Sequence, residues 1–147
     1  IIISANRNQS RYASFGHPVI EDNEPGFAGP LAGILAGLKA SGTPLLVCPC
    51  DAPLVSSKCF QRLRDALNYT TPCAVAHDGE RLQPMFLALA NDCRVDLETA
   101  FAAGERKLEH AIRQLDPAIV NCSDHPEWFY NANSSADLAA LAQANSL

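Results

Sequence analysis

The sequence predicts an α/β domain with a mostly parallel sheet that helices cover on both faces. Short apolar segments rich in β-branched residues alternate along the chain with segments whose apolar residues recur at helical spacing. No linker, internal repeat or low-complexity tract divides the 147 residues, a length that suits one domain with one hydrophobic core. We therefore expect residues 1–147 to form a single domain in which strands alternate with helices.

In the first half of the chain, the helix predicted at 30–41 has the clearest pattern. Its leucine and isoleucine side chains follow the spacing i, i+3, i+4, i+7, and Pro30 stands in the first turn, where proline is favoured. The run 45–48 is apolar on both faces, which predicts a central parallel strand. The other expected elements are strands at 1–4 and 18–20, an irregular loop at 24–30, and a helix that Ser56 or Ser57 caps and that turns Phe60, Leu63 and Leu67 toward the core.

The second half of the chain continues the alternation and ends in a helix. Ser134 and Asp137 form a capping-box-like arrangement at its start, and we expect Leu138 and Leu141 to point inward. The aromatic run 128–130 before it favours core packing over a stacking surface. The other expected elements are strands at 73–76 and 85–89 around a turn at 77–80, helices at 92–102 and 105–115 separated by Gly104, and a strand at 118–122.

Composition and charge exclude several classes of protein. An apolar fraction of 48% with 18% charged residues is that of an ordinary globular chain. Eleven Lys and Arg against sixteen Asp and Glu give a net charge of −5, which disfavours a nucleic-acid surface or an anchor to anionic membranes. No apolar run approaches the roughly 18 residues of a transmembrane helix. The first residues lack the basic flank and long apolar stretch of a signal peptide, so we expect none.

The six cysteines predict a reducing compartment. Most of them lie in apolar periodic segments, where a free cysteine behaves as a small hydrophobic residue. Cys48 and Cys50 form a close pair, but no second pair follows at zinc-like spacing and the four histidines are scattered. This favours reduced core cysteines over a metal–thiolate site, and we expect the protein in the cytoplasm.

Three polar residues follow predicted strands, at the edge of an α/β sheet where ligands bind. They are Asn6, Asp22 and Asp51. A carboxylate after an apolar strand can hold Mg²⁺ against substrate phosphates, but an Asp-x-Pro sequence also begins turns, and for Asp51 the two interpretations weigh about evenly. Asn6 can hydrogen-bond the edge of a nucleobase, and it can equally complete a loop.

Other candidate residues have a structural and a functional interpretation. Gly29 and Gly33 flank a helix N-terminus, which attracts anions, although tight packing of the helix on the sheet also requires glycine and is favoured here. Asn131 and Asn133 precede the last helix, and N-capping explains one asparagine but not both.

Two charged or titratable pairs point to no chemistry by themselves. His77-Asp78 resembles a base with its orienting carboxylate, but no nucleophile elbow accompanies it, which disfavours a catalytic triad. Arg106-Lys107 is typical of a solvated helix start, although it could reach an anionic ligand.

Six short tracts, taken together and in this order, resemble the bacterial molybdenum cofactor guanylyltransferases over essentially the whole chain. The tract that ends in Asp51 is the most specific of them. The resemblance implies a Rossmann-like nucleotidyltransferase fold and transfer of GMP from GTP to molybdopterin, with release of pyrophosphate. The tracts are Ser4-Ala5-Asn6-Arg7, Val19-Ile20-Glu21-Asp22, Gly29-Pro30-Leu31-Ala32-Gly33, Cys48-Pro49-Cys50-Asp51-Ala52-Pro53, His77-Asp78-Gly79-Glu80-Arg81 and Asn131-Ala132-Asn133.

The same resemblance implies a role for each candidate residue. Asn6 and Asp22 match positions that contact the guanine nucleotide, and Gly33 matches the wall of the nucleotide pocket. Asp51 matches the catalytic aspartate that binds Mg²⁺ and the nucleotide phosphates. The asparagines Asn131 and Asn133 match the molybdopterin side. The partners implied are GTP, molybdopterin, other proteins of molybdenum cofactor biosynthesis and acceptor molybdoenzymes, with neither nucleic acid nor membrane.

One departure from the family pattern concerns the phosphates. The family begins with a strand and a Gly-rich Leu-Ala-Gly-Gly loop, and an Arg and a Lys follow that loop. This N-terminal tract does not occur in the 147 residues. We therefore expect that the first βα unit is missing and that these 147 residues bind GTP weakly and are inactive alone. Two alternatives stay open: a nucleotidyltransferase of the same fold that transfers CMP to molybdopterin or a nucleotide to a sugar phosphate, and a non-catalytic module that binds the cofactor.

Overall fold

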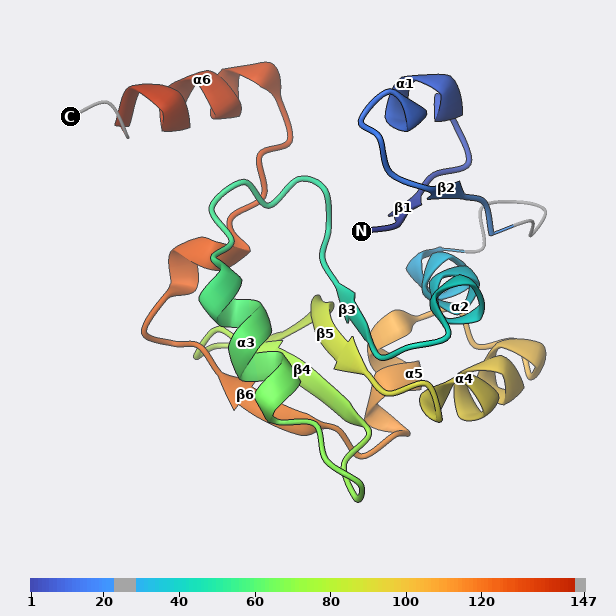
Figure 1. Cartoon of the computed structure of the whole chain (residues 1–147). Helices are drawn as coiled ribbons and strands as arrows, with labels where there is room; N and C mark the ends of the chain where they lie inside the picture. Colours follow the sequence, from blue (N-terminus) through green and yellow to red (C-terminus); the bar gives the residue numbers. More distant parts are fainter. Residues whose placement is uncertain (23–28, 145–147) are drawn as a thin grey trace.

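The computed structural model describes residues 1–22 and 29–144, and its strands and helices alternate as predicted (Figure 1). Helices α1 and η1, the latter a 3-10 helix, are additions to the prediction, and most of the expected loop at 24–30 lies outside the described residues. None of the described helices is long and apolar enough to cross a membrane. The elements are β1 (Ile3–Ser4), α1 (Gln9–Ala13), β2 (Val19–Ile20), α2 (Pro30–Ser41), β3 (Leu45–Val47), α3 (Ser57–Asp65), β4 (Cys73–His77), β5 (Leu82–Leu89), α4 (Cys93–Ala102), α5 (Leu108–Arg113), β6 (Ala118–Asn121), η1 (Pro126–Phe129) and α6 (Ser135–Ala144).

The strands form two sheets with both parallel and antiparallel pairs. Strands β1 and β2 pair in parallel, and a four-stranded sheet follows the order β3-β5-β4-β6. In that sheet β4 and β6 are parallel, whereas β5 runs antiparallel to both β3 and β4. The α/β class is confirmed, but the expectation of a mostly parallel sheet is wrong for the described strands, because β5 pairs antiparallel with both of its neighbours.

The prediction that 45–48 forms a central parallel strand is wrong for the described residues. Strand β3 lies at the edge of the four-stranded sheet and pairs antiparallel with β5, Val47 opposite Leu87. Leu46 is 45% exposed. The central positions belong to β4 and β5, whose own apolar runs are almost wholly buried. An apolar run predicts burial, but the choice of pairing partner depends on strands elsewhere in the chain.

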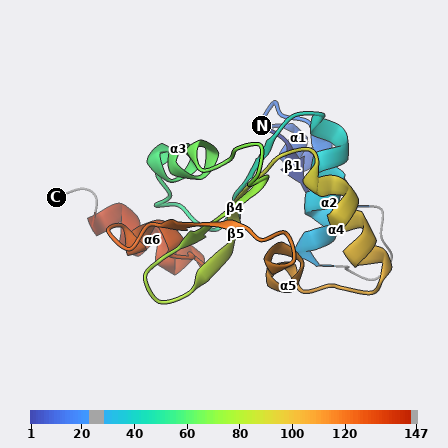
Figure 2. The same cartoon turned by 90° about the horizontal axis from the view of Figure 1, so that it is seen from below.

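Helices cover both faces of the four-stranded sheet, as predicted (Figure 2). Alternate residues of β4 face opposite sides, because successive side chains of a strand point to opposite faces. Cys73 and Val75 join the core beneath α2, α4 and α5, while Ala74 and Ala76 join the core beneath α3 and η1. Each face therefore has a hydrophobic core of its own.

Two glycines one helical turn apart let α2 lie close to strands of both sheets. A Cβ on Gly33 would lie 2.8 Å from the Ser4 hydroxyl of β1, and a Cβ on Gly37 would lie 3.1 Å from a methyl group of Leu45 in β3. Residues four apart share one face of a helix. Helix α2 thus connects the two-stranded sheet to the four-stranded one.

The pairing of β4 with β5 contains a bulge near the start of β5. Val75 pairs with Leu87, but the next residue of β4, Ala76, pairs with Gln83. The residues skipped on β5 include Pro84, which has no N–H to donate to a neighbouring strand. Bulges of this kind redirect side chains and are frequent next to functional sites.

Helix ends follow local signals. Ser56 caps α3 by accepting the N–H of Lys58 at 3.3 Å. Ser134 Oγ accepts the N–H of Asp137 at 3.2 Å, and Asp137 Oδ2 accepts the N–H of Ser134 at 2.9 Å, which confirms the capping box of α6. The expectation that Leu138 points inward is wrong, because α6 projects from the rest of the molecule (Figure 1) and Leu138 is 51% exposed.

The aromatic and cysteine predictions are largely confirmed. Trp128 is buried, and the ring of Phe129 packs edge-on against Phe86 with centroids 4.9 Å apart. Tyr130 is exposed, so the prediction fails for that ring, which points away from the core. All six cysteines are free thiols; those at 59, 73, 93 and 122 are buried, whereas those at 48 and 50 are exposed.

Candidate functional site

The candidate residues gather in two places, both at carboxyl ends of strands. We call the first the β1–β2 end and define it by Asn6 and Asp22. Because β1 and β2 are parallel, their carboxyl ends lie side by side, and the N–H of Asp22 donates to Asn6 Oδ1 at 3.2 Å. The structure thus brings together two residues that the sequence places sixteen positions apart.

The second place is the β3 end, defined by Asp51, Asn131 and Asn133. Asp51 follows β3 and is half-buried, while both asparagines are exposed. The N–H of Ala132 donates to the backbone carbonyl of Asp51 at 2.8 Å. Residues from the middle and the far end of the chain therefore meet here, with the two asparagines on either side of the bonded residue.

Gly33 lies behind the β1–β2 end, in the first turns of α2. A Cβ at this position would meet the Ser4 hydroxyl of β1, as described above, so the visible role of Gly33 is close packing of the helix on the strand. This is the structural interpretation that the sequence favours. Gly29 has a φ of 79°, a left-handed value that favours glycine, and it caps the N-terminus of the same helix.

The Cys48 thiol, close to Asp51 in the sequence, makes a poor metal ligand. Although its side chain is exposed, Cys48 has a pKa raised to about 11, because nearby protein atoms partly desolvate the thiol and the charges of Cys50 and Asp51 disfavour its thiolate. A thiol binds a metal ion as the thiolate, which this environment disfavours at neutral pH. Within residues 1–22 and 29–144, no three His, Cys, Asp or Glu side chains are grouped so as to hold a metal ion.

His77 and Asp78 organise a turn. His77 Nδ1 accepts the N–H of the residue two positions on at 3.0 Å. Asp78 accepts the N–H groups of Glu80 and Arg81, each at 2.8 Å, and the side-chain amide of Gln83 at 2.6 Å. Burial alone would raise the pKa of Asp78, but these donors outweigh it and hold the pKa below its ordinary value. The pair is therefore explained by turn structure.

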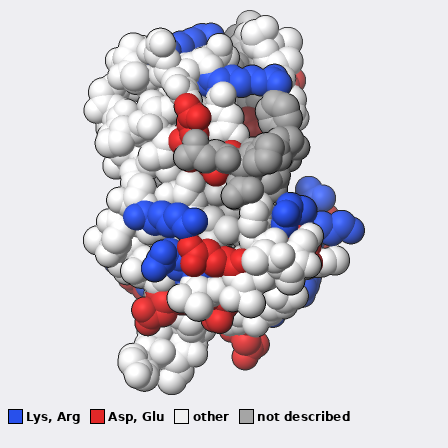
Figure 3. All heavy atoms as spheres, turned by 90° about the vertical axis from the view of Figure 1, so that its right-hand side faces the viewer, with Lys and Arg blue, Asp and Glu red and all other residues white. Residues whose placement is uncertain are grey.

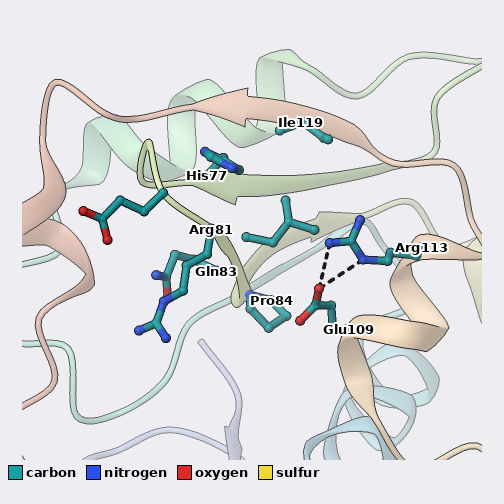
Figure 4. Close-up of a pocket in the computed structure, with 9 residues that line it drawn as sticks. His77, Arg81, Gln83, Pro84, Glu109, Arg113 and Ile119 are labelled. Carbon is teal, nitrogen blue, oxygen red and sulfur yellow. Dashed lines mark hydrogen bonds and ion pairs between the residues drawn. The ribbon is translucent and has the colours of Figure 1, made fainter.

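A hollow of about 600 Å³ lies between this turn, α5 and β6 (Figure 4). His77, Arg81 and Gln83 line it from the turn and the start of β5. On the opposite side, Arg113 donates to Glu109 at 2.7 Å, an i,i+4 pair within α5. Cationic and anionic groups are thus both present in its lining.

Arg106 folds back onto α4. It donates to the carbonyl of Phe101 at 2.7 Å, and its guanidinium lies 3.9 Å from the centroid of the Phe101 ring. A cation at the C-terminus of a helix is stabilised by the helix dipole.

On the face that carries α1, α2 and α4, basic and acidic side chains are interspersed (Figure 3), and Lys39 and Arg94 both pair with Glu98.

The sequence does not predict an ion pair that links α3 to the segment after β6. Arg62 donates to both carboxylate oxygens of Asp124, at 2.7 and 2.6 Å. The two residues are 62 positions apart, so no local spacing relates them. Asp124 lies in the segment that leads from β6 to Asn131 and Asn133, so the ion pair links this segment to α3.

Comparison with known proteins defines the class. A family model described as the MobA-like NTP transferase domain matches residues 1–119. A molybdopterin-guanine dinucleotide biosynthesis protein A from Archaeoglobus fulgidus superposes with a TM-score of 0.79 at 20% identity, over 99% of this chain and 78% of that one. A 4-diphosphocytidyl-2C-methyl-D-erythritolsynthase from Anaerococcus prevotii superposes with a TM-score of 0.73 at 10% identity, over 100% of this chain and 78% of that one. The chain has the Rossmann-like fold of nucleotidyltransferases and belongs to the MobA-like NTP transferase family.

Closer relatives define its group within that family. The molybdenum cofactor guanylyltransferase of Shewanella sediminis is 38% identical over 146 residues, which are 98% of this chain and 74% of that protein. The protein of the same name from Burkholderia vietnamiensis is 42% identical, over 97% of this chain and 75% of that protein. The chain belongs with the molybdenum cofactor guanylyltransferases.

Proposed function

We propose that this protein transfers GMP from GTP to molybdopterin and releases pyrophosphate. The observation that carries the proposal is its 36–42% identity, over nearly its whole length, to proteins named molybdenum cofactor guanylyltransferase. The grouping of the candidate residues at two carboxyl ends of strands supports it, because α/β proteins bind ligands at that edge.

The reaction needs positioning more than covalent chemistry by the protein. An oxygen of the molybdopterin phosphate attacks the α-phosphorus of GTP, a new phosphoanhydride bond forms, and the bond to the β-phosphate breaks. Pyrophosphate leaves with the bonding electron pair. Such transfers depend on alignment of the attacking and leaving oxygens and on neutralisation of charge. The protein must therefore hold two anionic substrates against each other.

The β1–β2 end is the proposed contact for the guanine nucleotide. A carboxylate such as that of Asp22 can accept from the adjacent N–H donors of guanine, and the exposed amide of Asn6 carries both donor and acceptor atoms. Gly33 would contribute to the pocket wall by leaving α2 close to β1.

Asp51 is the proposed ligand of Mg²⁺. Magnesium usually takes one or two carboxylates and completes its coordination with substrate phosphates and water, so a single half-buried carboxylate at the end of β3 suits it. When bound, Mg²⁺ supplies neutralisation of charge at the reacting phosphates. Asp51 itself holds its place through the backbone bond to Ala132.

Asn131 and Asn133 are the proposed contacts for molybdopterin. Their amides can donate to phosphate or pterin acceptors and accept from pterin N–H groups. The backbone bond between Ala132, which lies between the two asparagines in the sequence, and Asp51 supports this assignment, because the acceptor phosphate must arrive near the proposed metal ligand. The free thiols agree with a reducing compartment, and we place the reaction in the cytoplasm, with cofactor biosynthesis proteins and acceptor molybdoenzymes as partners.

The test is pyrophosphate release by the full-length natural protein with molybdopterin and Mg²⁺. GTP, CTP and ATP are compared at equal concentration, and we expect release with GTP to exceed the others by at least about a hundredfold, since a site built to hydrogen-bond one base leaves polar groups unpaired with another. Preference for CTP would instead indicate a cytidylyl transferase of the same fold. Absence of release with every nucleotide would leave a cofactor-binding module.

A further inference from the structure

Arg62, on α3, connects the helix to the chain that leads to the β3 end. Its two terminal nitrogens donate to the two carboxylate oxygens of Asp124 at 2.7 and 2.6 Å, and one of them lies 3.4 Å from the carbonyl oxygen of Asn121. A planar guanidinium that engages a carboxylate through two parallel hydrogen bonds restrains its orientation as well as its distance. The first residues after β6 are thus held in one geometry against α3.

The same guanidinium also contacts the aromatic anchor of this segment. Its central carbon lies 5.3 Å from the centroid of the Trp128 ring, which is only 4% exposed. The ring of His125 stacks on Trp128 with centroids 4.3 Å apart. Hydrogen bonding by Arg62 holds the pKa of Asp124 down to about 2, so the pair stays charged over the whole neutral range.

Contacts along its length hold the segment 121–132. Near its start, Arg62 binds Asp124; further along, the same guanidinium lies against the buried Trp128; at its end, the N–H of Ala132 is bonded to the carbonyl of Asp51. The side chains of Arg62 and Asp124 are 35% and 54% exposed, so the pair adds little to global stability. Its geometric restraint acts on the stretch of chain that ends in the two asparagines of the β3 end.

We propose that Arg62 is a positioning residue for the acceptor substrate. Through Asp124 and Trp128 it sets where Asn131 and Asn133 stand relative to Asp51, and it has no part in binding the nucleotide. This role rests on the proposed function, because it assigns the asparagines to molybdopterin.

The test measures the Michaelis constants for both substrates in Arg62→Met, Arg62→Lys and Asp124→Asn variants of the full-length natural protein. A misplacement of about 1 Å can cost up to roughly a hundredfold in rate, so we expect Arg62→Met to raise the KM for molybdopterin about tenfold while the KM for GTP stays within about twofold. Arg62→Lys keeps the positive charge but not the two parallel hydrogen bonds of the guanidinium, so we expect a KM for molybdopterin between those of the unmodified protein and Arg62→Met.

A matched control lies two residues further along the same helix. Arg64 pairs with its neighbour Asp65, both well exposed, and that pair joins no second element. We expect Arg64→Met to leave both Michaelis constants unchanged. A double variant with Arg62→Asp and Asp124→Arg restores an ion pair with its charges reversed. We expect its KM for molybdopterin to be lower than that of the single variant Arg62→Asp.

Hydrogen exchange at the Ala132 amide provides a readout that does not depend on activity. We expect Arg62→Met to accelerate exchange at this amide several-fold while amides of β4 and β5 keep their rates. Unchanged exchange together with an unchanged KM for molybdopterin would overturn the proposal, as would an equal rise in both Michaelis constants. If the unmodified protein transfers no nucleotide, the proposed function fails, and exchange at Ala132 still decides whether Arg62 holds the segment.

Discussion

The two ends of the candidate site are held by different kinds of contact. The β1–β2 end consists of two-residue strands, none of whose residues is fully buried, joined by parallel pairing and the bond between Asp22 and Asn6. The β3 end joins Asp51 to a segment near the far end of the chain, and that segment is anchored by the buried Trp128. The arrangement of residues at the β1–β2 end thus depends on contacts between two adjacent strands, whereas the arrangement at the β3 end depends on packing in the hydrophobic core.

This difference implies different tolerance to change. A substitution at the β1–β2 end should alter nucleotide binding without changing the stability of the fold or the β3 end, because few core residues pack against β1 and β2. A substitution of the buried Trp128, which anchors the segment of the β3 end, should change stability and the acceptor site together.

The largest effect is expected at Asp51. Asp51→Asn removes a proposed metal ligand but no core packing, so turnover should fall about a thousandfold while the fold stays intact. The measurement combines pyrophosphate release with thermal unfolding of the same sample. A folded Asp51→Asn variant with a near-normal rate would refute the metal assignment.

Removal of Trp128 should have the next largest effect. Trp128→Ala opens a cavity between α3 and the sheet and is expected to lower the free energy of unfolding by about 3 kcal/mol. The matched change at the other end is Val19→Ala on β2, which should cost at most about 1 kcal/mol because Val19 is only half-buried. Chemical denaturation measures both, and equal costs would contradict the contrast between the two ends.

Paired substitutions of asparagine test whether each end serves one substrate. Loss of one net hydrogen bond to a substrate costs about 1 to 1.5 kcal/mol, or roughly tenfold in affinity. We expect Asn6→Ala to raise the KM for GTP about tenfold and leave that for molybdopterin unchanged, and Asn131→Ala to do the reverse. If either variant raises both constants alike, the two ends do not bind separate substrates.

Features set by neighbouring residues could be predicted from the sequence. The helix at 30–41, the Ser56 cap and the capping box of α6 depend on residues within one or two turns, and each is confirmed. The positions of Asn6, Asp22 and Asp51 at carboxyl ends of strands follow from the same local patterns. These predictions succeed because spacing and side-chain chemistry over a few residues determine them.

Features that depend on distant residues could not be predicted. The edge position of β3 depends on the pairing of β5, which lies some forty residues further along the chain. The bond between Ala132 and Asp51 involves backbone atoms alone, so no side-chain pattern indicates it. The pair of Arg62 and Asp124 joins two charged residues that look, in sequence, like ordinary solvated positions.

The smallest effect is expected from titration of Asp124. Hydrogen bonding by Arg62 lowers its pKa to about 2, from an ordinary value of 3.8, with the nearby charge of His125 acting in the same direction. Because the folded pKa is depressed, the stabilisation is fully present above about pH 4 and is lost as the pH falls toward 2. The difference in unfolding free energy between the unmodified protein and Asp124→Asn should therefore be constant near neutrality and vanish across this window. The same comparison in an Arg62→Met background should show no such loss, since the donor that lowers the pKa is gone. A pH-independent difference in both backgrounds would mean that Arg62 does not stabilise the Asp124 carboxylate, and it would remove the electrostatic part of the support of the β3 end.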